Sequence, residues 1–149
     1  MDPSLSSILL LAHLLGLTMA VGAGAVKVML LIKCYNDHSL IQAYFKLAKS
    51  ITQMLIAGFI LLTVTGIIWI FTGYPFTFAL GVKSALVALV WILGPYIDNV
   101  AEPALVKLAP ASGEQGSAEF VQMQKKHFAL EIVAEGLFIA IIVMWVLFR

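Results

Sequence analysis

Four long apolar stretches constrain the fold of this chain more than any other feature. They cover about residues 5–32, 51–71, 76–97 and 128–148. A helix needs roughly 20 apolar residues to cross a hydrocarbon core of about 30 Å, and each stretch reaches that length. The chain is 62% hydrophobic and 11% charged, which leaves more apolar surface than a water-soluble domain of 149 residues can bury. The sequence therefore predicts an all-α integral membrane protein, a single domain over residues 1–149 in which four transmembrane helices form an antiparallel bundle.

The lysines between these stretches predict how the bundle lies in a membrane. The loops expected at about 33–50 and 98–127 fall on one side and hold Lys33, Lys46, Lys49, Lys107, Lys125 and Lys126. Of the basic residues outside the apolar stretches, the opposite side holds only Arg149. By the positive-inside rule, both loops face the cytoplasm and both termini lie outside, in a membrane of the bacterial inner-membrane type. Anionic lipid headgroups explain these lysines better than nucleic acid does.

The connections between the stretches carry their own signals. Apolar residues at helical spacing after Asp37 predict a short helix that runs directly into the second stretch. Gly73 and Pro75 predict a tight turn between the second and third stretches. The segment of about 98–116, rich in proline and glycine, is expected to be irregular, and Ser117 is expected to cap the fourth helix.

Ionisable residues inside a bilayer are costly, so each one suggests a function. Five lie within the apolar stretches: His13, Lys27, Lys83, Glu131 and Glu135. A helix rises about 1.5 Å per residue, which puts His13 at a depth of about 12 Å and Lys83 at about 10 Å, in one outer layer. The other three share the inner layer.

The inner layer admits two interpretations. Glu131 and Glu135 are four residues apart and so lie on one helix face, with Lys27 as the natural counter-ion. The group is either an ion pair that fixes the first helix against the fourth, or a carboxylate pair that relays protons or binds a cation.

The outer layer centres on His13. A face of small residues continues from it through Gly16, Ala20 and Gly24, where another helix or a flat macrocycle could lie against the backbone. His13 could therefore hydrogen-bond a serine or threonine in a close helix contact, or it could ligate haem iron. Lys83 at a similar depth would suit a carboxylate-bearing ligand or take part in proton transfer. Neither His38 nor His127 is expected to lie inside the membrane; each reads as a solvated interfacial residue.

Several short motifs carry a resemblance to a known family. They are "AHLLG" around His13, "LLTVTG" at residues 61–66, "GVKSALVALV" around Lys83, and "EIVAEGLFIAIIV" from Glu131. In this order the chain resembles the HemJ-type protoporphyrinogen oxidases and the related copper-resistance D-like membrane domains. The resemblance implies a bound haem b, with His13 as its axial ligand and Lys83 as a second functional residue. It further implies oxidation of protoporphyrinogen IX.

Three classes of function remain open from the sequence. The first is a haem b protein with a redox role, either porphyrinogen oxidation or electron transfer. The second is a small ion or metal transporter that uses His13 on the outside and Glu131 with Glu135 on the inside. The third is a structural or assembly subunit, in a homo-oligomer or a larger membrane complex, whose polar residues hold helices together.

Overall fold

The computed structural model describes the chain except for residues 1–2, 74, 112–113, 115 and 148–149. Within the described residues every regular element is helical. The elements in chain order are α1 (Pro3–Asn36), η1 (His38–Leu40), α2 (Ile41–Phe71), α3 (Phe78–Tyr96), η2 (Ile97–Ala101), α4 (Glu102–Leu108) and α5 (Ala118–Leu147). Four helical rods are long and apolar enough to cross a membrane: Ser4–Asn36, Ile41–Phe71, Phe78–Leu108 and Ala118–Leu147. The predicted four-helix, all-α class is confirmed to that extent.

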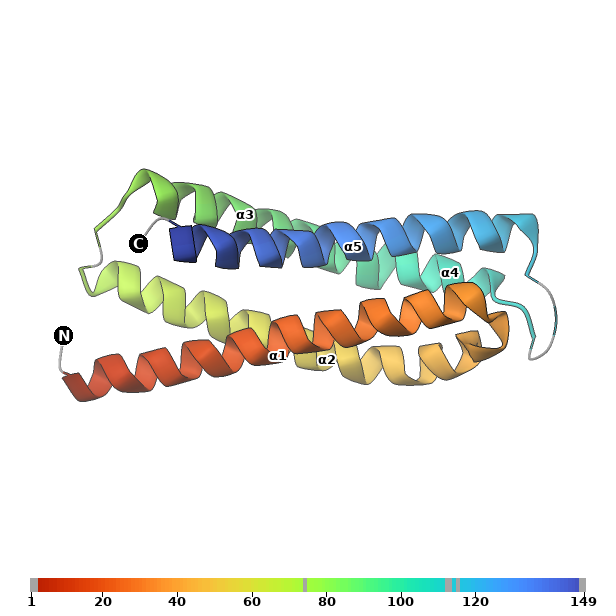
Figure 1. The fold of residues 1–149 in the computed structure, drawn as a ribbon, viewed down its shortest axis with the longest axis horizontal. Helices are drawn as coiled ribbons and strands as arrows, with labels where there is room; N and C mark the ends of the chain where they lie inside the picture. Colours follow the sequence, from red (N-terminus) through yellow and green to blue (C-terminus); the bar gives the residue numbers. More distant parts are fainter. Residues whose placement is uncertain (1–2, 74, 112–113, 115, 148–149) are drawn as a thin grey trace.

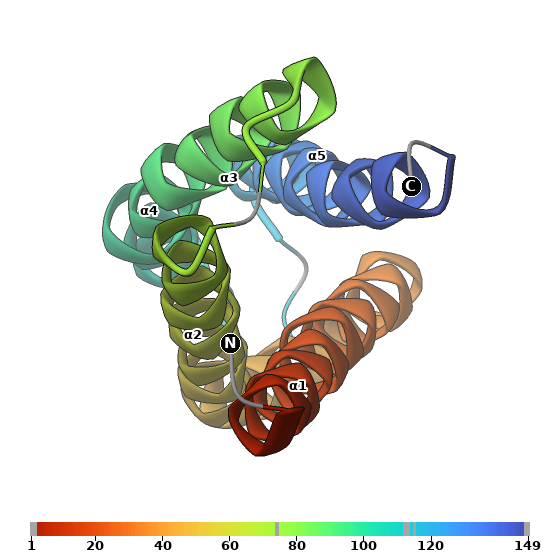
Figure 2. The same cartoon turned by 90° about the vertical axis from the view of Figure 1, so that its left-hand side faces the viewer.

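The four rods form an elongated bundle (Figure 1). α1 and α2 form a helical hairpin with the most extensive contact between any two elements, and α5 runs beside α3 and α4. The beginning of α1, the α2–α3 turn and the end of α5 lie at the same end of the bundle. Figure 2 views this end, where α3 and α5 lie together and apart from α1. The rods come closer toward the far end (Figure 1), and the buried Lys27, Gln124, His127 and Glu131 lie on the parts of α1 and α5 toward that end.

Glycine allows the close approach of α1 and α2. A Cβ atom added at Gly58 would lie 2.6 Å from the Ala20 nitrogen and 2.7 Å from the Gly16 oxygen. A Cβ added at Gly16 would lie 2.9 Å from the Gly58 oxygen. Both helices thus contact each other through backbone atoms, the arrangement that small residues permit between membrane helices.

Two apolar clusters occupy different levels of the bundle. One consists of Leu31, Cys34, Ile41, Tyr44, Ala48, Leu105 and Phe120. The other consists of Ala20, Phe59, Val90 and Phe138. Between these clusters, α1 carries the buried Lys27 and α5 carries the buried Gln124, His127 and Glu131, so a buried polar layer lies between two apolar ones.

The expectation of an irregular segment at 98–116 is wrong for its first part, because the helix continues to Leu108. Pro95 and Pro103 both lack an N–H group, and a π-helical turn over Ile97–Ala101 accommodates the resulting break in the hydrogen-bond ladder. The Asn99 side-chain amide donates to the Pro95 carbonyl at 2.8 Å. Pro103 then stands in the first turn of α4, where proline is well tolerated.

The other connections follow the sequence-based expectations. The Ser117 hydroxyl accepts a hydrogen bond from the Phe120 amide at 3.1 Å, which confirms the predicted cap of α5. Gly73 has φ 98°, a conformation that favours glycine, in the turn after α2. The segment expected to run into the second stretch is indeed continuous with it, since α2 begins at Ile41.

Candidate functional site

Lys27 is the centre of a buried polar cluster, the inner charge cluster, formed by Lys27, Asp98, Glu102, His127 and Glu131. The Lys27 side chain is only 2% exposed. Its ammonium lies 2.7 Å from Glu131 Oε1, 3.2 Å from Glu102 Oε2 and 3.3 Å from Asp98 Oδ1. The cluster therefore joins α1, the η2–α4 segment and α5 through a single nitrogen atom.

Helical spacing directs these side chains to one place. On α5 the buried residues are Phe120, Gln124, His127, Glu131 and Phe138, which follow the three- and four-residue steps of one helix face. Asp98 and Glu102 are also four residues apart, and they share a face with the buried Ile97, Ala101 and Leu105. The apolar residues of each face pack in the bundle, so the polar residues on that face are buried with them.

His127 completes the cluster without a hydrogen bond of its own. Its side chain is 0% exposed, and neither ring nitrogen has a hydrogen-bond partner among the described residues. Nε2 lies 3.7 Å from Glu131 Oε1 and 3.9 Å from Glu102 Oε2, which is beyond hydrogen-bond distance. The interpretation of His127 as a solvated interfacial residue is wrong, because the residue lies on the buried face of α5.

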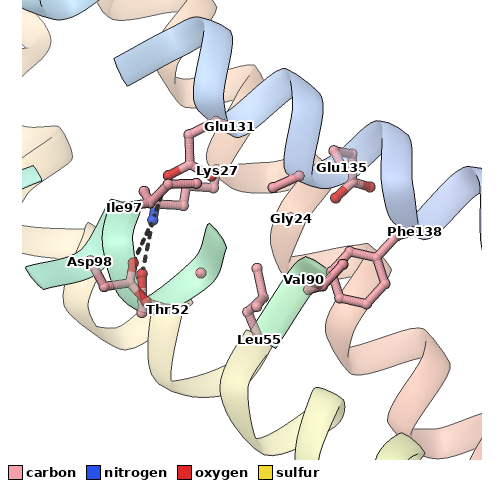
Figure 3. A pocket seen from close by; sticks show the side chains of 12 residues that line it. Gly24, Lys27, Thr52, Leu55, Val90, Ile97, Asp98, Glu131, Glu135 and Phe138 are labelled. Atoms are coloured by element: carbon pink, nitrogen blue, oxygen red, sulfur yellow. Dashed lines mark hydrogen bonds and ion pairs between the residues drawn. The ribbon is translucent and has the colours of Figure 1, made fainter. Parts of the chain in front are cut away.

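Thr52 gives Lys27 a fourth polar neighbour. Its hydroxyl accepts a hydrogen bond from the ammonium at 3.1 Å, next to the Asp98 contact (Figure 3). Lys27 thus has two sets of partners. Glu102 and Glu131 form one set, on the side of His127, and Asp98 with Thr52 forms the other.

A small cavity of about 30 Å³ extends from the cluster toward Glu135. Lys27, Asp98 and Glu131 line it at one end, and Glu135 and Phe138 line it at the other (Figure 3). This volume has room for about two water molecules. Glu135 has no hydrogen bond or ion pair within the described residues. Its carboxylate lies against Gly24, where any added Cβ would collide with it.

The formal charges of the cluster do not balance. Asp98, Glu102 and Glu131 can contribute three negative charges, and Lys27 contributes one positive charge. With His127 neutral, the ionised cluster has a formal net charge of −2. Isolated buried charge is costly, so this excess favours protons or another cation in the cluster.

His13 lies on α1 about 21 Å from Lys27, given 14 residues at about 1.5 Å each. Its Nδ1 lies 2.8 Å from the Thr65 hydroxyl oxygen. That hydroxyl also lies 2.7 Å from the Leu61 carbonyl and 3.0 Å from the Leu62 carbonyl, and it can only donate to these. When the hydroxyl donates to its own helix, Thr65 accepts the hydrogen bond from His13. This arrangement puts the proton of the neutral ring on Nδ1 and leaves the Nε2 lone pair free.

The rest of the outer layer is less closely connected. The His13 ring packs against Trp69, with centroids 4.9 Å apart. Lys83 on α3 is partly exposed and makes no hydrogen bond or ion pair with the described part of the chain. Gly16 and Ala20 contact α2, and Gly24 contacts Glu135, so this face is filled by protein instead of lying open to a flat macrocycle.

Sequence reasoning found Lys27 and Glu131 but missed Asp98, Glu102 and His127. A usable signal was present, because His127 and Glu131 are four residues apart, as are Asp98 and Glu102. No family model, curated protein or solved structure matches the chain.

Proposed function

We propose that this chain is an integral membrane protein that binds haem b through His13 and takes part in electron transfer or porphyrinogen oxidation. The observation that supports it is the hydrogen bond from His13 Nδ1 to Thr65. Histidines that ligate metals generally donate their other ring N–H to a fixed acceptor, which sets the tautomer and the ring orientation. Thr65 supplies such an acceptor, and Trp69 restricts the ring on its face.

One part of the outer layer fits a bound haem and another part does not. His13 offers a lone pair of the correct kind at Nε2. Gly16, Ala20 and Gly24 do not form the cofactor cradle expected from the sequence, because α2 and Glu135 already cover them. The proposal therefore rests on His13 as the axial ligand. Lys83, on α3 and expected at a similar depth to His13, is a cation that could pair with a carboxylate of the bound group.

Each residue has a defined part in this proposal. A bound haem would supply one-electron chemistry. His13 would hold the iron, and Thr65 would keep the ring in the Nδ1–H tautomer. Trp69 and the apolar surface around it would exclude water, which keeps the local dielectric low.

We also propose the arrangement in the membrane. The four apolar rods would span the bilayer with the lysine-bearing segments at 33–50 and 98–127 in the cytoplasm. The inner charge cluster would then lie toward the cytoplasmic side, and His13 toward the outside. The support is the lysine distribution in the sequence, together with the common end at which α1 begins and α5 ends (Figure 1).

Haem titration of the purified protein in detergent tests the role of the Thr65 hydrogen bond. The variant Thr65→Val keeps the shape of the side chain and removes the acceptor for Nδ1. We expect it to weaken haem binding by about 10–100-fold, the usual cost of losing such a partner of a metal ligand. The variant His13→Ala should weaken binding further. Equal haem affinity in the wild type and both variants would contradict the proposal and favour a structural role for His13.

A further inference from the structure

The inner charge cluster contains more charged and polar groups than an internal ion pair requires. A lysine and one glutamate would suffice to join α1 and α5, yet two more carboxylates and a buried imidazole surround the same ammonium. The imidazole has no hydrogen-bond partner in the part of the chain that the structure describes. A fully buried histidine in this condition is unusual, since buried polar groups are generally satisfied.

The potential ligand atoms of Glu102, His127 and Glu131 converge. One carboxylate oxygen from each glutamate and one ring nitrogen of His127 all lie within 4.8 Å of one another. Two carboxylates and an imidazole form a ligand set that suits divalent first-row transition metals such as zinc or manganese. Magnesium and calcium prefer oxygen ligands only, so the histidine disfavours them.

The geometry points to a divalent transition-metal site formed by Glu102, His127 and Glu131, in which the Lys27 ammonium acts as a built-in competitor of the metal. The ammonium lies 2.7 Å from Glu131 Oε1 and 3.2 Å from Glu102 Oε2, so it contacts the same two oxygens that would bind the metal. Asp98 and Thr52 lie on its other side at 3.3 Å and 3.1 Å. Lys27 can therefore keep these two partners when a metal takes the glutamates.

The charge of the cluster supports the same conclusion. The ionised cluster carries a formal charge of −2, which one divalent cation would neutralise while Lys27 stays charged and paired with Asp98. The side chains of Asp98 and Glu102 are 23% and 18% exposed, while that of Glu131 is 7% exposed. In the proposed membrane arrangement the cluster lies toward the cytoplasmic side, from which a cation would approach along the η2–α4 segment. This site is separate from the proposed haem ligand, which lies about 21 Å away along α1.

Zinc chloride and manganese chloride titrations of the full-length protein in metal-free detergent buffer test the site. We expect saturable binding with one metal per chain, measured by calorimetry, and a melting temperature that rises with metal concentration. The variants Glu131→Gln and His127→Asn should each raise the Kd by about 100-fold or more, since loss of an outer partner alone costs about 10–100-fold. Glu119→Gln is the matched control, because Glu119 is an exposed residue of the same helix and should leave the Kd unchanged.

Lys27→Met separates a metal site from a purely structural ion pair. If the ammonium competes with the metal, this variant should bind zinc more tightly than the wild type, and zinc should restore its melting temperature. A structural pair predicts a destabilised Lys27→Met protein that zinc does not restore. The absorption of bound cobalt(II) gives a second readout, which should change in His127→Asn if that ring is a ligand.

Three results would overturn the inference. The first is no metal binding by the wild type. The second is binding that Glu131→Gln and His127→Asn leave intact, which would mean adventitious surface sites. The third is a Lys27→Met variant that binds zinc no better than the wild type. None of these results depends on haem, so this inference can fail while the proposed function stands, and the reverse also holds.

Discussion

Gly58→Ala tests how closely α1 and α2 must pack to support His13. The new methyl group would lie 2.6 Å from the Ala20 nitrogen, 2.7 Å from the Gly16 oxygen and 2.9 Å from Met19 Cβ. Ordinary contact begins at 3.4 Å, so the helices would have to separate by up to about 0.8 Å at this point. Two of the three atoms belong to the backbone, which cannot rotate away as a side chain can.

The expected cost follows from two opposing effects. Overpacking of this kind costs about 1–3 kcal/mol. Replacing glycine by alanine inside a helix gains about 1 kcal/mol from intrinsic propensity. Gly66→Ala is the matched control, because Gly66 lies in α2 as well and an added Cβ there meets no atom within 4 Å. The propensity gain is common to both variants, so the difference between them should equal the overpacking cost of about 1–3 kcal/mol.

Unfolding in mixed detergent micelles, with increasing SDS and helicity as the signal, measures this difference. We expect Gly66→Ala to be as stable as the wild type or more stable, and Gly58→Ala to be less stable than Gly66→Ala. Because Thr65 lies two turns beyond Gly58 on α2, separation of the helices should also weaken the His13–Thr65 hydrogen bond. Equal stability of the two variants would refute the close α1–α2 contact.

Two further substitutions, Lys27→Met and Tyr44→Phe, test buried polar groups in the inner charge cluster and beside it. Lys27→Met removes the ammonium shared by the buried Glu131 and the partly exposed Asp98 and Glu102, and it should cost about 3–5 kcal/mol in the same unfolding assay without metal. Lys33→Met, on the exposed surface of α1, should change stability by less than about 0.5 kcal/mol, and a Lys27→Met cost equally small would count against a buried ion pair. Tyr44→Phe should be neutral or stabilising, because the buried Tyr44 hydroxyl makes no hydrogen bond within the described residues. A loss of more than about 1 kcal/mol there would mean that the hydroxyl has a partner, such as a water molecule.

The sequence alone could predict the long helices, because hydropathy over a window of about 20 residues reports them directly. It also indicated the Lys27–Glu131 pair, since both residues interrupt otherwise apolar stretches. Local signals were sufficient as well for the Ser117 cap and for the turn at Gly73, where one residue determines the structure.

The composition of the inner charge cluster could not be predicted in the same way. The prolines and glycines of about residues 98–116 predict an irregular segment after the third apolar stretch, and a π-helical turn is not visible in sequence. That expectation puts Asp98 and Glu102 in a loop. His127 follows two lysines and reads as interfacial, and only the packing of α5 against the other helices shows that its face is buried. Contacts between helices therefore determine the positions of Asp98 and Glu102 as well as the burial of His127.

The contact between His13 and Thr65 also depends on how the helices pack. The sequence allowed a serine or threonine partner, but it could not say which one, because the partner depends on the register of α1 against α2. That register is fixed by the close approach at Gly16 and Gly58, a contact between residues 42 positions apart.

The measurement that tests the central proposal most directly is a reduced-minus-oxidised absorbance spectrum of the protein purified from haem-sufficient cells, recorded beside the His13→Ala variant. We predict a b-type α band in the wild type and its loss in His13→Ala, with the variant still monodisperse in detergent. A wild-type preparation without that band, or a band that persists in His13→Ala, would contradict His13 as the haem ligand.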